Sequence, residues 1–270
     1  MSLKEFFGFG GYQREAEGFM SWQHLTFVTS FIVVMVICAI VLGRRNRTAS
    51  TEQKNRVLVV TAILIDAIEL FKIVVMCIGN HDPLYFVNVL PLFLCSIQLI
   101  SIPMAAFCKG RMKKAALDFV QIFGLLGAIL GTYCAGNNFS CYPIFGFDNI
   151  VSVTTHTIAG FASLYIMISG MSSMEKRDIP ITAAVLAGFC VAAYVANVFW
   201  DCNYMFLSRG DGTPYDIVYN LVNGNQVLYP LCVVGLFVLY INLYYHVYYA
   251  ITSRSSKNMC RAEEACVRHS

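Results

Sequence analysis

Cys95 and His156 are the two residues whose types could together carry covalent chemistry. Cys95 lies in the apolar stretch NVLPLFLCSIQLISIP, and His156 lies in DNIVSVTTHTIAGFASLY. A neighbouring histidine can take the proton of a thiol and leave the reactive thiolate. Gln98, Asn197 or backbone amides could then stabilise an oxyanion. The alternatives are an inert thiol that packs as a small apolar group and a histidine that joins two helices by a hydrogen bond.

Three ionisable residues stand three positions apart in TAILIDAIELFKIVVM, namely Asp66, Glu69 and Lys72. On a helix this spacing places them on one face and allows Glu69 to pair with Lys72. Charged groups inside a bilayer are costly unless they are paired or line a cavity. The face is therefore either a buried ion pair that fixes helix packing or the wall of a hydrated cavity.

The depth of these residues along their helices indicates one polar layer. Counted from the outer helix ends at about 1.5 Å per residue, Lys72, Cys95 and His156 lie roughly 9–11 Å deep. Glu69 and Gln98 lie together at about 15 Å by the same count. We therefore expect Glu69, Lys72 and Gln98 to shape a polar pocket around Cys95 and His156.

The elements that position these residues are expected to be membrane helices. The chain is 57% hydrophobic and 13% charged, whereas an ordinary soluble domain has about 25% charged residues. Apolar runs long enough to cross about 30 Å of hydrocarbon recur along the chain. The sequence therefore predicts an all-α, polytopic membrane protein with a bundle of seven transmembrane helices, at residues 22–42, 57–79, 88–108, 115–134, 150–171, 179–200 and 225–250.

Lysine and arginine residues set the expected orientation, because basic loops tend to stay cytoplasmic. The loops after the first, third and fifth helices and the C-terminal segment hold 15 of the 19 basic residues, whereas the N-terminal segment and the other loops hold 3. We therefore expect the N-terminus outside and the C-terminus inside. Residues 1–21 are predicted to form an outer segment, 22–250 the bundle and 251–270 a cytoplasmic tail, all within a single domain in the cell membrane.

Several classes of function are not expected from the sequence. The net charge of +3 reflects the topology, so we expect membrane lipids as partners and no nucleic acid. The chain has no Walker loop, no GxGxxG in a βαβ setting, no HExxH and no paired zinc-ligand motif, so we expect neither a nucleotide nor a metal cofactor. No cleavable signal peptide is visible before the first apolar run, which is expected to act as its own anchor. The oligomeric state stays open.

The segment FWDCNYMFLSRGDGTPYD ends the sixth predicted helix and forms the loop after it. Asp201, Asn203 and Tyr204 are expected either to cap that helix or to border the mouth of the cavity, where Asn197, Asp201 and Asn203 could contact a substrate. A disulfide is left open among three cysteines on the predicted outer side: Cys134, Cys141 and Cys202.

Four features of the chain also occur together elsewhere: LPLFLC (90–95), His156, CNYMFL (202–207) followed by Pro214, and VLYPL (227–231). In their order and spacing the chain resembles the YwaF family of multi-pass membrane proteins over most of its length. More distantly, it looks like a eukaryotic membrane protein implicated in phospholipid acyl transfer through a cysteine and a histidine on separate helices. That group in turn resembles the androgen-induced lipid hydrolases, which use a threonine and a histidine.

The resemblance implies that Cys95 and His156 form a catalytic pair, and it implies no other catalytic residue. The position of Phe93 is commonly a histidine in the YwaF family, so no role is carried over to Phe93.

Two functions from different classes fit these residues. In the first, a lipid acyltransferase or hydrolase, Cys95 attacks an acyl ester that enters from the outer leaflet, and His156 shuttles the proton while the acyl group passes to a lysolipid or to water. In the second, a transporter or ligand-binding membrane protein uses the same polar layer without covalent chemistry. A structural membrane protein is a third possibility. Only the first of these functions, the enzyme, predicts that Cys95 reacts with an acyl-mimetic electrophile in a manner that depends on His156.

Overall fold

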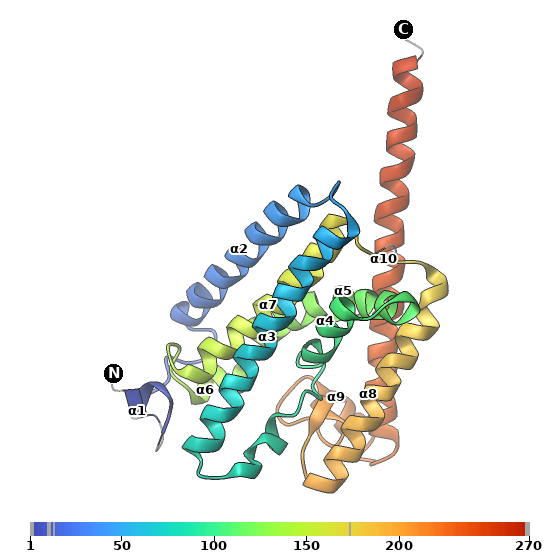
Figure 1. Cartoon of the computed structure of the whole chain (residues 1–270). Coiled ribbons are helices and arrows are strands. Elements are labelled where there is room, and N and C mark those ends of the chain that lie inside the picture. Colours follow the sequence, from blue (N-terminus) through green and yellow to red (C-terminus); the bar gives the residue numbers. More distant parts are fainter. Residues whose placement is uncertain (1–2, 10–11, 13, 173, 268–270) are drawn as a thin grey trace. The chain divides into compact units, whose positions relative to one another are not determined.

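The structure is a computed structural model that describes residues 3–9, 12, 14–172 and 174–267, with side chains up to residue 251. Over these residues the chain forms helices and loops and contains no β-strand (Figure 1). The helices are α1 (Leu3–Phe6), α2 (Trp22–Arg45), α3 (Thr51–Gly79), η1 (Pro83–Val89), α4 (Gln98–Phe107), α5 (Gly110–Tyr133), α6 (Gly136–Cys141), α7 (Phe147–Ser169), η2 (Lys176–Asp178), α8 (Ile179–Trp200), η3 (Tyr204–Phe206), α9 (Tyr215–Leu221) and α10 (Leu228–Val267), where η denotes a 3₁₀ helix.

Helix length and composition make the protein a multi-pass membrane protein. Within the described part of the chain, five helical segments are long and apolar enough to cross a bilayer: Trp22–Arg45, Gly110–Cys141, Phe147–Ser169, Lys176–Trp200 and Leu228–Ile251. The other two predicted crossings differ from these. α3 has 29 residues but carries Asp66, Glu69 and Lys72, and α4 has only 10 residues.

The third predicted helix, residues 88–108, is corrected by the structure. Its first part is the end of η1 followed by a turn, and regular α-helix begins only at Gln98. Pro91 explains the break, because proline lacks a backbone N–H and forces the residue before it out of the α conformation. Leu90 accordingly has φ −58° and ψ 148°. Cys95 therefore lies in a turn at the entrance of a short helix and not in the middle of a long one.

Local sequence explains several other helix ends. Ser21 and Ser50 cap the starts of α2 and α3, since each side chain accepts a hydrogen bond from the backbone N–H three residues further on, at 3.2 Å in both cases. α7 ends at Gly170, whose φ of 67° is a left-handed conformation that favours glycine. α8 begins and ends at the predicted residues 179 and 200.

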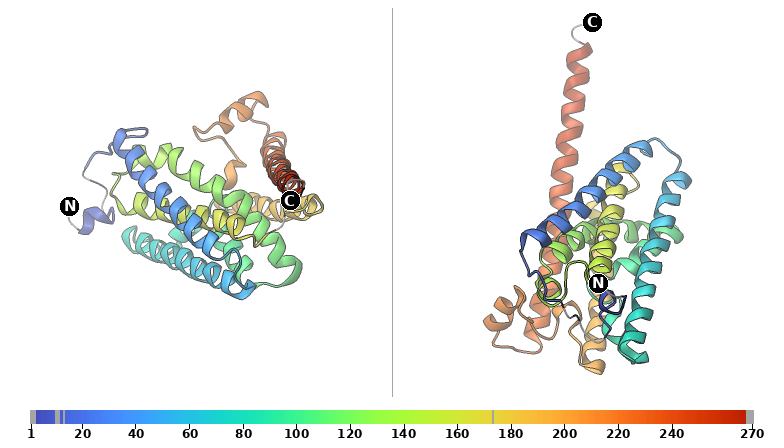
Figure 2. Two further views of the ribbon diagram at one scale, coloured as in Figure 1. Left: turned by 90° about the horizontal axis from the view of Figure 1, so that it is seen from above. Right: turned by 90° about the vertical axis from the view of Figure 1, so that its left-hand side faces the viewer.

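The chain divides into two compact units, and all predicted site residues belong to the first, residues 1–172 and 189–205. α7 is the central helix of this unit and packs against α5, α2 and α3. α2, α3 and α7 run side by side in the views of Figures 1 and 2. α4 packs between α3 and α5, so the segment that carries Cys95 is held next to the central helices.

Small residues let the central helices approach closely. A Cβ atom added to Gly124 of α5 would lie 2.6 Å from the carbonyl oxygen of Ala159 in α7. One added to Gly160 of α7 would lie 2.5 Å from the sulfur of Met35 in α2. Helix pairs inside membranes commonly use small residues in this way, because close backbone contact replaces a hydrophobic driving force.

The second unit comprises residues 173–188 and 206–270. It contains η2, the first half of α8, α9 and α10. The Thr182 and Tyr245 hydroxyls lie 3.0 Å apart and join α8 to α10, and the Lys176 ammonium lies 5.1 Å from the centre of the Tyr249 ring. The predicted tail, residues 251–270, continues α10 to Val267, and its last three residues lie outside the described residues.

Candidate functional site

The turn that carries Cys95 is closed by its own hydrogen bonds. The Ser96 hydroxyl accepts from the Phe93 N–H at 3.0 Å and lies 3.2 Å from the Phe93 carbonyl oxygen. The Ile97 N–H also donates to the Phe93 carbonyl, at 2.9 Å. The turn therefore holds Cys95 just before the N-terminal end of α4.

His156 of α7 has one ring nitrogen fixed by the backbone. Its Nδ1 lies 2.6 Å from the carbonyl oxygen of Ser152, one helical turn earlier. A carbonyl oxygen can only accept, so Nδ1 carries a proton, and in the neutral ring Nε2 is then the basic nitrogen. A side-chain hydrogen bond joins His156 to the Cys95 thiol. Both residues are half-buried.

Two glycines of α5 make room for the pair. A Cβ atom at Gly131 would lie 2.0 Å from Cδ2 and 2.1 Å from Nε2 of His156. A Cβ atom at Gly127, one turn earlier, would lie 3.4 Å from Cα and Cβ of Cys95, which is ordinary close contact. α5 therefore forms the common wall behind Cys95 and His156, and of these two glycines only Gly131 leaves no room for a Cβ atom.

The predicted ion pair of α3 is present next to the pair. Lys72 Nζ lies 3.0 Å from Glu69 Oε1, and both side chains are largely buried. Lys72 is also close enough to His156 and to Asp148 to interact electrostatically with each. The structure thus brings Lys72 and Cys95 each close enough to His156 to interact with its ring.

Gln98 and Asp66 have buried side-chain polar atoms that lack a hydrogen-bond partner among the described residues. Gln98 is completely buried, and both the oxygen and the nitrogen of its side-chain amide lack such a partner. The same is true of Oδ1 of Asp66. Buried polar groups are almost always paired, with protein or with ordered water. Gln98 follows Cys95 by three residues, so a polar region continues from the pair into the bundle.

A second polar contact was not expected from the sequence. The Tyr12 hydroxyl donates a 3.0 Å hydrogen bond to Oδ2 of Asp148 at the start of α7. Burial and the neighbouring carboxylate raise the pKa of Tyr12 above its usual range. The only signal in the sequence was the acidic residue at the beginning of a helix, where it interacts favourably with the helix dipole. This contact fastens the N-terminal segment to the end of α7 nearest Lys72.

The three predicted residues of the later loop take different positions. Asn197 is buried at the end of α8, and its amide bonds the backbone of Tyr204 twice: Oδ1 accepts from the Tyr204 N–H at 2.6 Å, and Nδ2 donates to the Tyr204 carbonyl at 3.1 Å. Asp201 is exposed, with a left-handed φ of 50°. Asn203 is half-buried in the same loop. Asn197 therefore holds the loop, and both of these hydrogen bonds go to Tyr204 and not to Cys95 or His156.

Tyr204 connects this loop to the segment before Cys95. Its hydroxyl accepts from the Leu90 N–H at 3.0 Å and donates to the Val87 carbonyl. Its ring meets that of Phe93 edge to face, with the ring centres 5.0 Å apart. The segment CNYMFL thus reaches the Cys95 segment through one tyrosine.

Two other kinds of site were considered in the sequence, a metal site and a disulfide. No group of three histidine, cysteine or acidic side chains within the described ranges is arranged to hold a metal ion. Cys134 and Cys141 have free thiols, and the Cys202 thiol lies 3.5 Å from the Trp200 carbonyl oxygen.

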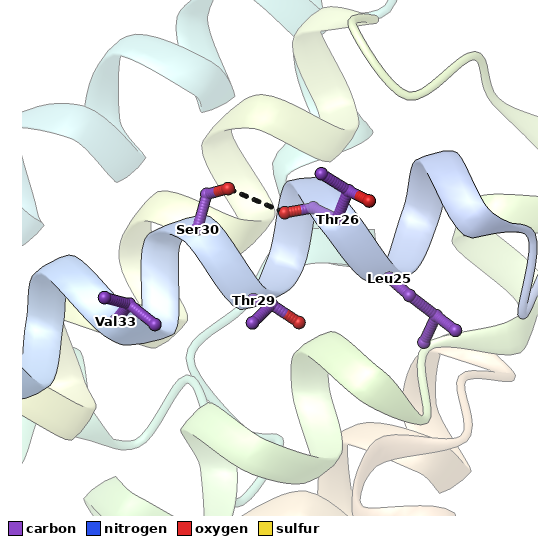
Figure 3. Close-up of a pocket in the computed structure, with 5 residues that line it drawn as sticks. All are labelled: Leu25, Thr26, Thr29, Ser30 and Val33. Atoms are coloured by element: carbon purple, nitrogen blue, oxygen red, sulfur yellow. Dashed lines mark hydrogen bonds between the residues drawn. The ribbon is translucent and has the colours of Figure 1, made fainter.

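A shallow hollow of about 580 Å³ lies along the exposed side of α2. Figure 3 shows its lining, in which the Ser30 hydroxyl donates to the Thr26 carbonyl at 2.7 Å. The hydroxyl of Ser30 is thus satisfied within its own helix. The hollow contains none of the predicted site residues: it is lined by Leu25, Thr26, Thr29, Ser30 and Val33.

Comparison with known proteins identifies the family. Neither the curated proteins nor the solved structures give a match to the chain. The model of the TMEM164 family matches residues 19–248, a range that includes every predicted site residue. The predicted membership of a family of polytopic membrane proteins is thus confirmed, and the matching model is named for TMEM164 and not for YwaF. This integral membrane protein belongs to the TMEM164 family.

Proposed function

We propose that the protein is a membrane-embedded lipid acyltransferase or hydrolase in which Cys95 is the nucleophile and His156 the general base and acid. The observation that carries the proposal is the hydrogen bond between the two side chains, with Nδ1 of His156 already fixed on the Ser152 carbonyl. A nucleophile, a base and a group that orients the base are the parts that activated-nucleophile catalysis needs. Membrane lipids are the proposed substrates.

The proposed reaction has two steps. In the first, Nε2 of His156 takes the thiol proton, and the Cys95 sulfur attacks the carbonyl carbon of an acyl ester. The carbon–oxygen ester bond then breaks, a thioester forms, and the imidazolium returns its proton to the departing alkoxide. In the second, a lysolipid hydroxyl or water loses its proton to His156 and attacks the thioester. The carbon–sulfur bond breaks, and the thiolate takes the proton back.

The polar residues around the pair are assigned to the pocket. Lys72, with its Glu69 partner, lies beside His156, and the amide of Gln98 has bonding capacity that no described residue uses. We assign these three residues to shaping a polar pocket for the ester. Asp201 and Asn203 are assigned to its outer border, where the loop is partly exposed.

We further propose seven crossings, with the N-terminus outside and the C-terminus inside, in the cell membrane. α3 has 29 residues and is therefore about 44 Å long, enough to cross the hydrocarbon. The third crossing would consist of η1, the Cys95 turn and α4. Backbone that is not helical is tolerated at membrane depth only where protein covers it or water reaches it, which fits a turn that is partly exposed and packed on α5. The distribution of basic residues supports the orientation.

A second function is favoured by a different observation. Glu69, Lys72 and Asp148 gather near one end of α7, and the Gln98 amide has no described partner. Such a polar region could bind a ligand for transport or sensing without any covalent step. The two functions differ in whether Cys95 ever carries an acyl group.

The test is an acyl-transfer assay on the full chain in lipid nanodiscs, with a phospholipid that carries a labelled acyl chain and a lysophospholipid acceptor. Cys95→Ala is expected to abolish both product formation and a hydroxylamine-sensitive acyl label on the protein. Cys108→Ala, at the far end of α4, is the matched control and should retain both. Full activity of Cys95→Ala would refute the nucleophile. An acyl label absent from the native protein, together with saturable lipid binding, would favour the second function.

A further inference from the structure

The hydroxyl of Tyr204 pairs two backbone groups that the break in the third crossing leaves without helical partners. η1 ends at Val89, and the chain turns away at Leu90. The Leu90 N–H therefore donates to the Tyr204 oxygen at 3.0 Å, and the Tyr204 hydroxyl donates to the Val87 carbonyl. A phenol can accept and donate at once, so one side chain satisfies both groups.

Tyr204 is itself held in place from the other side. It is 1% exposed, and the Asn197 amide bonds its N–H and its carbonyl at 2.6 and 3.1 Å. The next residue, Met205, has a φ of 55°, a conformation that residues other than glycine rarely adopt. Such strain persists only where surrounding contacts enforce it, and it is typical of constrained functional segments.

The contacts of Tyr204 continue directly to Cys95. Its ring packs edge to face on Phe93, and Phe93 supplies the N–H and the carbonyl that close the turn around Cys95 through Ser96. A movement of Tyr204 would therefore move Phe93 and, with it, the direction of the Cys95 thiol. His156, in contrast, is fixed by α7 and by Gly131.

From this chain of contacts we infer that Tyr204, supported by Asn197, is the positioning residue that sets Cys95 against His156. The inference rests on the proposed function only in taking Cys95 as the nucleophile. Tyr204 does not touch the reacting atoms. Its role is to fix the otherwise unsupported segment between η1 and α4, so that the thiol and the imidazole share a hydrogen bond.

The experiment measures the coupling of Cys95 to His156, which a merely stabilising tyrosine would not alter. The full chain is reconstituted in nanodiscs, and the rate at which iodoacetamide alkylates Cys95 is followed by peptide mass spectrometry between about pH 6 and pH 9, the range in which histidine and cysteine ordinarily titrate. Four proteins form a cycle: native, Tyr204→Phe, His156→Gln and the double variant. Tyr165→Phe is the matched control, because it also removes a buried hydroxyl with two hydrogen bonds, to Asn46 and to the Lys54 carbonyl.

Tyr204→Phe is expected to lower the alkylation rate near neutral pH about tenfold, since misplacement by an ångström has effects of this order or larger. His156→Gln should lower it to a similar rate, and the double variant should fall no further. Tyr165→Phe should keep the native rate and pH profile. A Tyr204→Phe protein with the native rate and undiminished dependence on His156 would overturn the inference.

Two further measurements keep the result interpretable. Asn197→Ser leaves the Tyr204 hydroxyl in place but removes the longer amide, and it should reduce the rate in the same direction by a smaller factor. It replaces Tyr204→Phe if that variant does not fold, and a native rate for Asn197→Ser then overturns the inference. The acyl-transfer assay runs in parallel. If Tyr204→Phe uncouples the pair while the native protein transfers no acyl group, the proposed function fails and the positioning role stands.

Discussion

His24 of α2 and His156 of α7 pack against neighbouring positions of α5, yet their rings are used in opposite ways. His24 is completely buried. Its Nδ1 accepts from the Met20 N–H at 3.1 Å, and its Nε2 lies 3.1 Å from the Thr132 carbonyl oxygen, so both nitrogens bond the backbone. Because one partner donates and the other accepts, His24 is held as a neutral ring with the proton on Nε2.

His156 has only one nitrogen occupied in this way. Nδ1 lies against the Ser152 carbonyl, and the ring bonds the Cys95 thiol while Gly131 leaves it space. The two rings therefore differ in the number of nitrogens that the backbone occupies. Both nitrogens of His24 are occupied, whereas Nε2 of His156 stays available for the proposed proton transfer.

The largest effect is expected for His156→Gln. Loss of a general base typically costs 10²–10⁴-fold in rate, so acyl transfer should fall by a factor of this size. The alkylation rate of Cys95 should fall by about the same factor as in Tyr204→Phe, without a large change in melting temperature. His246→Gln is the matched control, because Nδ1 of His246 lies 2.7 Å from the carbonyl oxygen of Asn242, also one turn earlier, on an exposed side chain. A native alkylation rate in His156→Gln would show that His156, like His24, has no part in activating Cys95.

The next largest effect is expected for Gly131→Ala. Its new methyl group would lie 2.0 Å from the His156 ring, so the ring must move, and the transfer rate should fall about 100-fold because small misplacements of catalytic groups have effects of that size. Gly127→Ala is the paired variant, since its methyl group would meet Cys95 only at 3.4 Å. It should change the rate little. Equal rates for the two alanine variants would show that the ring is not confined as described.

His24→Gln should affect stability and not chemistry. It disturbs two buried hydrogen bonds, and a buried group left without its partner costs about 1–3 kcal/mol. The expected result is a lower melting temperature in nanodiscs with the native alkylation rate of Cys95. A slowed alkylation at native stability would contradict the structural role of His24 and weaken the contrast with His156.

The smallest effect is expected at the Tyr12 hydroxyl, which tests whether the polar contact at the end of α7 is also structural. Its pKa is raised in the folded protein, so its contribution to stability is complete below the unfolded value of about 10 and is lost as the pH rises through the folded value. Tyr12→Phe should lower stability by about 1 kcal/mol at neutral pH. It should also flatten the fall in melting temperature above pH 10, and an unchanged fall would contradict the contribution of this contact.

Much of the fold followed from the apolar runs, because helix length in a bilayer is set by its thickness. The spacing of Glu69 and Lys72 predicted their ion pair, which is a local property of a single helix. The depth assigned to Cys95 assumed a regular helix from residue 88, whereas α-helix begins only at Gln98. The sequence predicted a continuous helix where the structure has the break before Cys95. Apolar residues continue on both sides of Pro91, and the prediction gave them more weight than the backbone N–H that proline lacks.

Residues whose role depends on a distant partner could not be assigned from the sequence. Asn197 was expected near a substrate, but its amide bonds the backbone of Tyr204 seven residues later. The Tyr12 contact to Asp148 joins groups 136 residues apart. His24 gave no signal at all, since the spacing of an apolar helix does not reveal whether a polar side chain on it has partners in another helix.

The close contact of Gly124 also has a mechanical consequence. Where the backbones of α5 and α7 touch, no flexible side chain lies between the two helices to absorb a deformation. We therefore expect the pair of α5 and α7, which holds His156, to be stiffer than the broken segment before α4. A bilayer that thickens or thins around the protein would displace the thiol and leave the imidazole in place, so the composition of the surrounding membrane could itself tune the alignment of the pair.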